Sequence, residues 1–117
     1  FSNFENIGKK LVFFRNKKIN TKFKGFDTTF SVKKNIRNYV GTLKNNNTNI
    51  QVDFFSNLPG VQLYSAQNLN YKKKLFPYQG ICLETQYFPD APNKKNFPST
   101  LIKPNKRYTC FTKIKIN

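Results

Sequence analysis

The sequence predicts an all-β fold, a sandwich or barrel of short antiparallel strands. Several short segments alternate apolar and polar side chains, which is the period-two pattern of a half-buried strand. Turn-forming residues separate these segments, for example in 45–49 and 57–60. No segment has the 3.6-residue periodicity of an amphipathic helix.

The first half of the chain is expected to contain four strands. A short apolar run predicts a strand over 10–14, and a polar loop follows it. Apolar residues then fall on alternate positions in 25–32 and 50–56, as in strands with one buried face. A further strand is expected over 38–44, with Tyr39 and Leu43 on one face and Val40 on the other. The Asn-rich link between the last two of these strands predicts a hairpin.

The second half is expected to contain three strands separated by long loops. In 61–66, Gln62 and Tyr64 share one face, and more apolar residues occupy the other. A clean alternation predicts the last strand over 108–117. The intervening residues 87–107 are rich in Pro, Asn and Lys, and they predict a loop.

The remaining strand, 80–86, is a mostly apolar run that predicts burial and yet contains Glu84. The chain has only five carboxylates, and burying one without a partner is costly. The period-two pattern places Glu84 on one face with Cys82 and Gln86. A glutamate that faces solvent or pairs with a lysine would need no function. Functional sites, however, are also the places where a residue departs from the apolar pattern of the strand that carries it.

Composition limits the chain to at most one domain and makes it strongly basic. It has 117 residues and a formal net charge of +16. Eighteen of the 21 basic residues are Lys and only three are Arg, whereas readout of bases and phosphates favours Arg. The lysines are also scattered along the chain. We therefore expect no nucleic-acid partner.

The chain has no histidine and two cysteines, Cys82 and Cys110. The absence of histidine removes the commonest metal ligand and acid–base group, and the cysteines lack C-x-x-C spacing. We expect no metal site and two free, buried thiols in a reducing compartment, although a disulfide between them is conceivable. No apolar run is long enough to span a membrane and no signal peptide is visible, so a cytoplasmic location is expected.

Four stretches of the chain resemble, in order, the aldose 1-epimerase (galactose mutarotase) family. They are 25–32, 58–65, 80–93 with 96–99, and 101–108. The third stretch is long and specific, and it contains the run Glu84-Thr85-Gln86-Tyr87-Phe88-Pro89-Asp90-Ala91. The resemblance covers nearly all of this chain but only the C-terminal part of the family's domain.

The resemblance implies a partial fold and a set of roles. Residues 1–117 would be the C-terminal part of one large antiparallel β-sandwich, the galactose mutarotase-like supersandwich. Glu84 would be the catalytic general base, and Asp27 and Gln62 would bind the substrate. That substrate would be an aldohexose such as galactose or glucose, with no metal or organic cofactor, nucleic acid or membrane involved. Taken singly, Asp27 would also suit an Asx-turn and Gln62 an exposed strand position.

The implied reaction interconverts α and β anomers by opening the sugar ring. A base takes the proton of the C1 hydroxyl while an acid protonates the ring oxygen, and closure after rotation about C1–C2 reverses both transfers. The family's acid is a histidine from the upstream part of its domain, and Thr28 replaces another family histidine. The acid is therefore expected from outside this chain, from a separate N-terminal segment.

Several states of the protein agree with these observations. The chain would be a fragment, one product of a split gene, or an inactive remnant. A carbohydrate-binding β-sandwich without catalysis is the alternative from another functional class. Because a divided sandwich leaves open strand edges, the isolated chain is expected to aggregate or to need a partner.

Overall fold

The computed structural model describes residues 25–33, 37–45 and 48–117, which are all-β apart from one short 3-10 helix. The elements are β1 (Asp27–Ser31), β2 (Tyr39–Lys44), β3 (Gln51–Ser56), β4 (Gly60–Tyr64), β5 (Cys82–Gln86), η1 (Ala91–Asn93) and β6 (Thr112–Ile116). Each strand falls within, or overlaps most of, a strand predicted from the sequence. The predicted strand over 10–14 lies outside the described residues.

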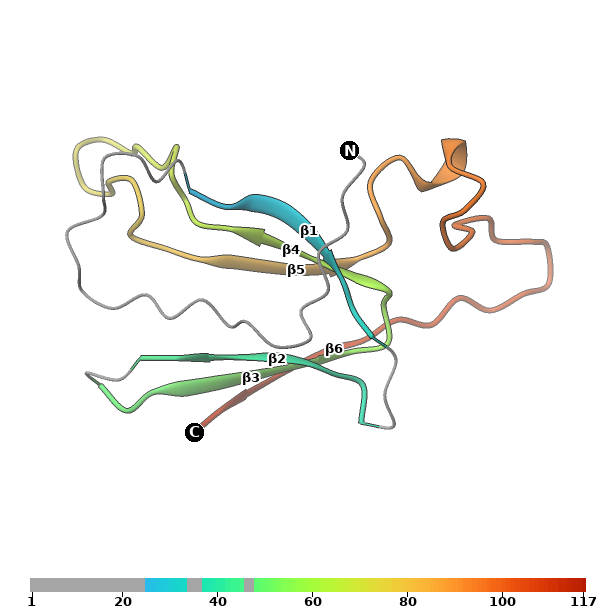
Figure 1. Ribbon diagram of the computed structural model, residues 1–117, viewed down its shortest axis with the longest axis horizontal. Coiled ribbons are helices and arrows are strands. Elements are labelled where there is room, and N and C mark those ends of the chain that lie inside the picture. Colours follow the sequence, from blue (N-terminus) through green and yellow to red (C-terminus); the bar gives the residue numbers. More distant parts are fainter. Residues whose placement is uncertain (1–24, 34–36, 46–47) are drawn as a thin grey trace.

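The strands form two antiparallel sheets of three strands each. Sheet A has the order β1-β4-β5 and sheet B the order β2-β3-β6. Figure 1 shows sheet A above sheet B, with the two converging near the middle of the view. The predicted antiparallel β-sandwich is confirmed in partial form, without closure into a barrel.

The chain changes sheet three times, between β1 and β2, β3 and β4, and β5 and β6. Backbone hydrogen bonds connect the segment that leads from β1 to β2 with the segment that leads from β3 to β4. Val32 N–H donates to the Pro59 carbonyl at 2.8 Å, and Ser56 N–H donates to the Asn38 carbonyl at 2.8 Å. The β1–β4 pair therefore continues directly into the β2–β3 pair, and the two sheets meet at this corner.

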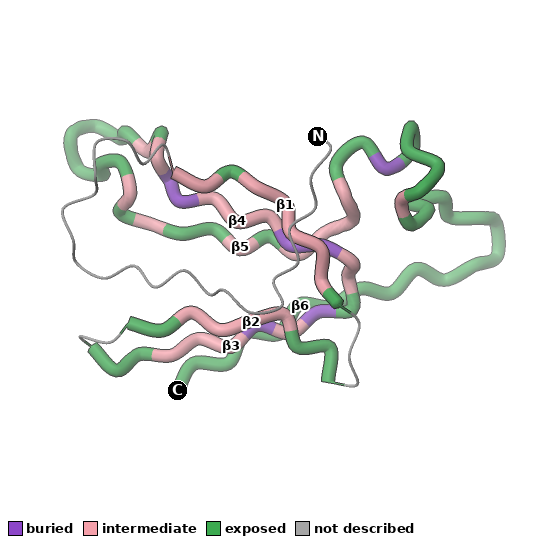
Figure 2. Tube along the Cα trace, in the orientation of Figure 1, coloured by how far each residue is buried: buried purple, intermediate pink, exposed green. Residues whose placement is uncertain are grey.

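Part of the buried core lies close to this corner. Val61 on β4 is 1% exposed and Phe54 on β3 is 8% exposed. The side-chain hydroxyls of Thr85 on β5 and Thr112 on β6 form a hydrogen bond between the sheets. Figure 2 shows buried segments at the crossing, just beyond the end of β4 and in the loop after β5, whereas β6 is exposed along its whole length.

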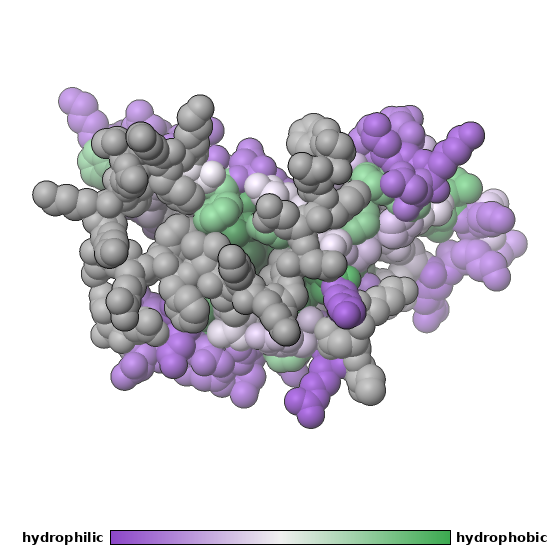
Figure 3. All heavy atoms as spheres, in the orientation of Figure 1, coloured by the Kyte–Doolittle hydropathy of each residue, from purple (hydrophilic) through white to green (hydrophobic). Residues whose placement is uncertain are grey.

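Hydrophilic side chains gather at the outer margins of the molecule. Figure 3 shows them below sheet B and around the loop after β5, while apolar side chains are visible between the sheets. Within the described ranges, no helix has the length and apolarity needed to cross a bilayer.

The burial predicted for β5 was wrong. Cys82 and Glu84 are exposed, and among the described strands β5 lies at the edge of sheet A, where it pairs only with β4. The thiols of Cys82 and Cys110 are free, as predicted, but both are exposed rather than buried. Period-two alternation indicates which residues share a face, but it does not show whether a second layer covers that face.

The last strand is shorter than predicted, because residues 108–111 are irregular instead of forming its first part. Strand β6 begins at Thr112, not at Tyr108. The Asn57 side chain occupies the place of a strand partner there: its amide donates to the Thr109 carbonyl at 3.0 Å, and its oxygen accepts from Phe111 N–H at 3.0 Å. A side-chain amide therefore replaces the backbone ladder just beyond the end of β3.

A carboxylate on β3 joins the three strands of sheet B. Asp53 Oδ1 accepts hydrogen bonds from Thr42 on β2 and from Gln51 Nε2 at 3.0 Å, and Oδ2 accepts from Asn117 Nδ2 at 2.9 Å. The Thr42 hydrogen bond, followed by those from Gln51 and Asn117, holds the pKa of Asp53 below its usual range.

Acid is therefore expected to weaken sheet B through Asp53. A carboxylate with a lowered folded-state pKa stabilises the fold at neutral pH, and this contribution is lost as the pH falls below about 4. Urea unfolding at several pH values should show a steeper loss of stability in the wild type than in Asp53→Asn. Parallel curves for the two proteins would contradict this role.

Candidate functional site

One face of sheet A carries a patch of polar side chains contributed by its three strands. Strand register places Thr29 on β1, Gln62 on β4 and Glu84 on β5 opposite one another. Asp27 and Tyr64 are paired two residues away on the same two strands. Because side chains two residues apart lie on the same side of a strand, all five share one face, opposite to that of Val61.

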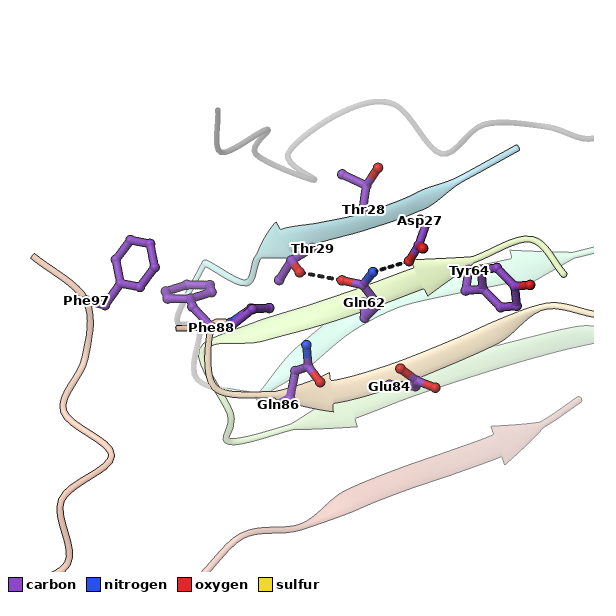
Figure 4. A pocket seen from close by; sticks show the side chains of 10 residues that line it. Asp27, Thr28, Thr29, Gln62, Tyr64, Glu84, Gln86, Phe88 and Phe97 are labelled. Carbon is purple, nitrogen blue, oxygen red and sulfur yellow. Dashed lines mark hydrogen bonds between the residues drawn. The ribbon is translucent and has the colours of Figure 1, made fainter. Parts of the chain in front are cut away.

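This face forms the floor of a cavity of about 670 Å³ (Figure 4). Its described lining residues are Asp27, Thr28, Thr29, Gln62, Tyr64, Glu84, Gln86, Phe88, Pro89 and Phe97. The three site residues singled out from the sequence, Asp27, Gln62 and Glu84, therefore line the same cavity, although they come from three different strands.

The Gln62 side chain is held between two neighbours on β1. Its Nε2 donates to Asp27 Oδ1 at 2.6 Å, and its Oε1 accepts from the Thr29 hydroxyl. Because an ionised carboxylate only accepts, the amide nitrogen must face Asp27 and the amide oxygen must face Thr29. No partner among the described residues takes Asp27 Oδ2, so the pair offers an acceptor and an amide hydrogen to a ligand.

Glu84 stands one strand away from this pair and is directly opposite Gln62. It is exposed, and its carboxylate has no hydrogen-bond or ion-pair partner in the part of the chain that the structure describes. Ile81 is exposed and Leu83 lies on the other face of β5, whereas Phe88 lines the cavity together with Glu84. Glu84 therefore faces the cavity as an unpaired acceptor.

The start of β1 is fixed so that Asp27 reaches the cavity. Phe26 N–H donates to Ser65 Oγ at 2.7 Å, and Ser65 is 3% exposed. Gly25 has a φ of +86°, and a Cβ there would lie 2.7 Å from Gln67 Oε1 and 2.8 Å from Ser65 Oγ. Only glycine suits this backbone conformation and this close approach, which explains its place just before Phe26 and Asp27.

Aromatic side chains close one end of the cavity. Phe88 and Phe97 pack edge to face, with ring centroids 5.2 Å apart and an interplanar angle of 62°. The Phe88 ring lies against Gly60 at the start of β4, where a Cβ would be 2.9 Å from Phe88 Cε1. The missing side chain of Gly60 thus makes room for the aromatic wall.

A compact turn carries the chain from Phe88 to Phe97. Asp90 has a φ of 61° and precedes η1, and its Oδ1 accepts from Asn93 Nδ2 at 2.5 Å. Lys94 Nζ lies 3.5 Å from Asp90 Oδ2. The predicted loop therefore contains a tight turn at Asp90, and the side-chain contacts of Asp90 fix the path of the chain there.

Sequence reasoning did not assign site roles to several lining residues. Gln86 and Tyr64 could have been found, because the period-two pattern already placed them beside Glu84 and Gln62. Thr29 depends on the register between β1 and β4, which the sequence does not reveal. The positions of Phe88 and Phe97 depend on how the loop after β5 folds, which the sequence does not reveal either.

The chemistry of the cavity suits an uncharged ligand that has several hydroxyl groups. Its described lining contains two carboxylates, two side-chain amides and three hydroxyls, with aromatic rings at one end and no Lys or Arg. Hydroxyl groups need such paired acceptors and donors, and the partly apolar walls limit competition from water. No group of three or more metal-ligating side chains occurs among the described residues.

Comparisons with known proteins point to one family. A family model described as aldose 1-epimerase matches residues 4–115. Galactose mutarotase of Mus musculus is 29% identical over 100 residues, which cover 80% of this chain and 29% of the relative. The Bos taurus and Homo sapiens proteins of the same name are 32% and 31% identical over 91 residues, covering 72% of this chain and 27% of each relative. The chain thus spans less than a third of the length of these relatives.

Proposed function

Since this chain belongs to the aldose 1-epimerase family, we propose that it forms the base-bearing part of a mutarotase site. In that site α and β anomers of an aldohexose such as galactose or glucose interconvert by acid–base ring opening. The observation that carries the proposal is that Glu84, Asp27 and Gln62 line the same cavity.

Glu84 acts as the general base in this proposal. Its carboxylate is unpaired among the described residues and faces the cavity, so it is available to take the proton of the C1 hydroxyl. Loss of that proton pushes electrons toward C1 as the bond to the ring oxygen breaks. After rotation about C1–C2, the same carboxylate returns the proton when the ring closes on the other face.

Asp27 and Gln62 bind and orient the sugar. Asp27 Oδ2 accepts from one sugar hydroxyl, while the second hydrogen on Gln62 Nε2 donates to another. Thr29 keeps the amide in the orientation that this role requires. A sugar held in this way presents its C1 hydroxyl to Glu84 on the neighbouring strand.

The proton donor to the ring oxygen comes from another polypeptide segment. The chain has no histidine, and Thr28 stands in the cavity where the family resemblance places one. We propose that 1–117 corresponds to the C-terminal part of the family's domain, and that a separate N-terminal segment supplies the acid. A cytoplasmic location agrees with two free, exposed thiols, Cys82 and Cys110.

The missing histidine also supports a second candidate function. Without an acid, the same cavity would bind a sugar without converting it. This carbohydrate-binding alternative keeps the roles of Asp27 and Gln62 but leaves Glu84 as a further hydrogen-bond acceptor.

Polarimetry separates the two candidates. The chain is mixed with the part of mouse galactose mutarotase that lies outside its 100 matched residues, and freshly dissolved α-D-galactose and α-D-glucose are added. We expect the mixture to accelerate mutarotation roughly 10²–10⁴-fold over either component alone, the range typical of acid–base catalysis. Sugar binding by a formed complex that shows no acceleration would establish the carbohydrate-binding alternative.

A further inference from the structure

The outer edge of β6 is an uncovered surface of the sandwich. Among the described strands β6 pairs only with β3, and all five of its residues are exposed. Ile114 is 57% and Ile116 is 72% exposed, although strand register places them beside Phe54 and Val52 on the inner face of sheet B. Two large apolar side chains on this face thus remain more than half exposed.

The backbone of the same residues is directed outward. Gln51 and Asn117 exchange both N–H···O bonds, at 3.1 and 2.9 Å. Because hydrogen-bonded and non-hydrogen-bonded pairs alternate along an antiparallel ladder, Lys115 is the next residue bonded to β3. The N–H and C=O groups of Ile114 and Ile116 therefore point away from β3, toward the open edge.

We propose that this edge receives a β-strand from polypeptide outside residues 1–117, which carries the part of the aldose 1-epimerase domain that this chain does not span. The added strand is apolar on the side facing Ile114 and Ile116 and acidic on the other. This inference deepens the proposed function and relies on it only for the partner's identity. The partner extends sheet B by main-chain hydrogen bonds, the usual mode of strand addition.

Charge favours such a partner over a second copy of this chain. Lys113 and Lys115 occupy the outer face of β6, and the chain has a formal net charge of +16. Two β6 edges placed side by side would bring these lysines together, and like charges on neighbouring strands are destabilising. An acidic strand would instead pair with them.

The relative lengths point to the same occupant. The family relatives are more than three times as long as their matched segments, which amount to 27–29% of each protein. A three-stranded sheet with an exposed apolar edge is the feature expected where a larger sandwich continues into more polypeptide. The outward-facing N–H and C=O groups of β6 and the exposed side chains of Ile114 and Ile116 are available to pair with an added strand.

Amide hydrogen exchange and light scattering test the proposal on the whole chain. The probe is the part of mouse galactose mutarotase outside its 100 matched residues. We expect a one-to-one complex in which the amides of Ile114 and Ile116 become protected, whereas the Lys115 amide is protected with or without the probe. Complex formation is measured apart from turnover, so a complex without mutarotation overturns the proposed function and not this inference.

Proline provides a specific variant because the Ile114 N–H points outward. Ile114→Pro removes no hydrogen bond to β3, and edge strands tolerate proline at such positions. It should weaken the complex about tenfold or more, since one main-chain bond and one apolar contact are lost. Ile114→Val, which keeps both, should bind almost as the wild type does. Unchanged protection of Lys115 shows that each variant keeps its β3–β6 pairing.

Three results would overturn the inference. The first is the absence of any complex with the wild-type chain. The second is protection of the Ile114 and Ile116 amides in the chain alone, which would assign the edge to a second copy or to residues 1–24. The third is a complex in which these two amides still exchange freely.

Discussion

Glu84→Gln is expected to abolish mutarotation by the complemented chain while leaving its fold and its sugar binding nearly unchanged. Glutamine has the same shape and still accepts a hydrogen bond through its amide oxygen, but it cannot take a proton. Removal of a general base typically lowers the rate by about 10²–10⁴-fold. The fall should appear in kcat, because the hydrogen bonds that hold the sugar involve Asp27 and Gln62.

Stability should not confound this result. Glu84 is exposed and has no hydrogen-bond or ion-pair partner among the described residues, so its replacement breaks no contact that the structure shows. A control is Lys106→Gln, which also removes one exposed charge and lies outside the described cavity lining. The control should retain the wild-type rate.

Polarimetry and sugar titration together decide the role of Glu84. A Glu84→Gln variant that binds sugar but turns over at the buffer rate supports a general base. Equal turnover in Glu84→Gln and in the wild type would remove Glu84 from the mechanism. Loss of sugar affinity with an unchanged kcat would instead make Glu84 a binding residue.

Local patterns predicted most of the strands because each sheet has one apolar face. The alternation in 50–56 and the pairing of Gln62 with Tyr64 were both visible in the sequence, and both survive in β3 and β4. The ends of strands were less predictable. Asn57 interrupts the ladder before β6 by a contact between residues more than fifty positions apart.

The polar part of the site could be predicted, whereas its walls could not. Asp27, Gln62 and Glu84 were identified from the resemblance, and the register of three strands brings them to one cavity. The burial expected for β5 was wrong because, among the described strands, β5 lies at the edge of its sheet, and edge position is a property of the whole sheet. The aromatic wall depends on how the loop after β5 folds back, which no local pattern records.

Gly60→Ala is expected to destabilise the protein and to reshape the cavity, whereas Gly41→Ala is expected to do neither. A Cβ at Gly60 would lie 2.9 Å from Phe88 Cε1 and 3.3 Å from the Gln86 carbonyl oxygen. Phe88 must therefore move, and its packing against Phe97 is disturbed. Overpacking of this kind costs about 1–3 kcal/mol.

Gly41 offers a matched control because it is also a strand glycine but has open space around it. A Cβ there meets no atom within 4 Å, so alanine gains the roughly 0.5–1 kcal/mol by which it exceeds glycine in a strand. Urea unfolding of the two variants should move in opposite directions from the wild type, and only Gly60→Ala should weaken sugar binding by the complemented chain. If Gly60→Ala bound and unfolded like Gly41→Ala, Phe88 would not be the wall that shapes the cavity, and the aromatic end would have to be assigned to Phe97 alone.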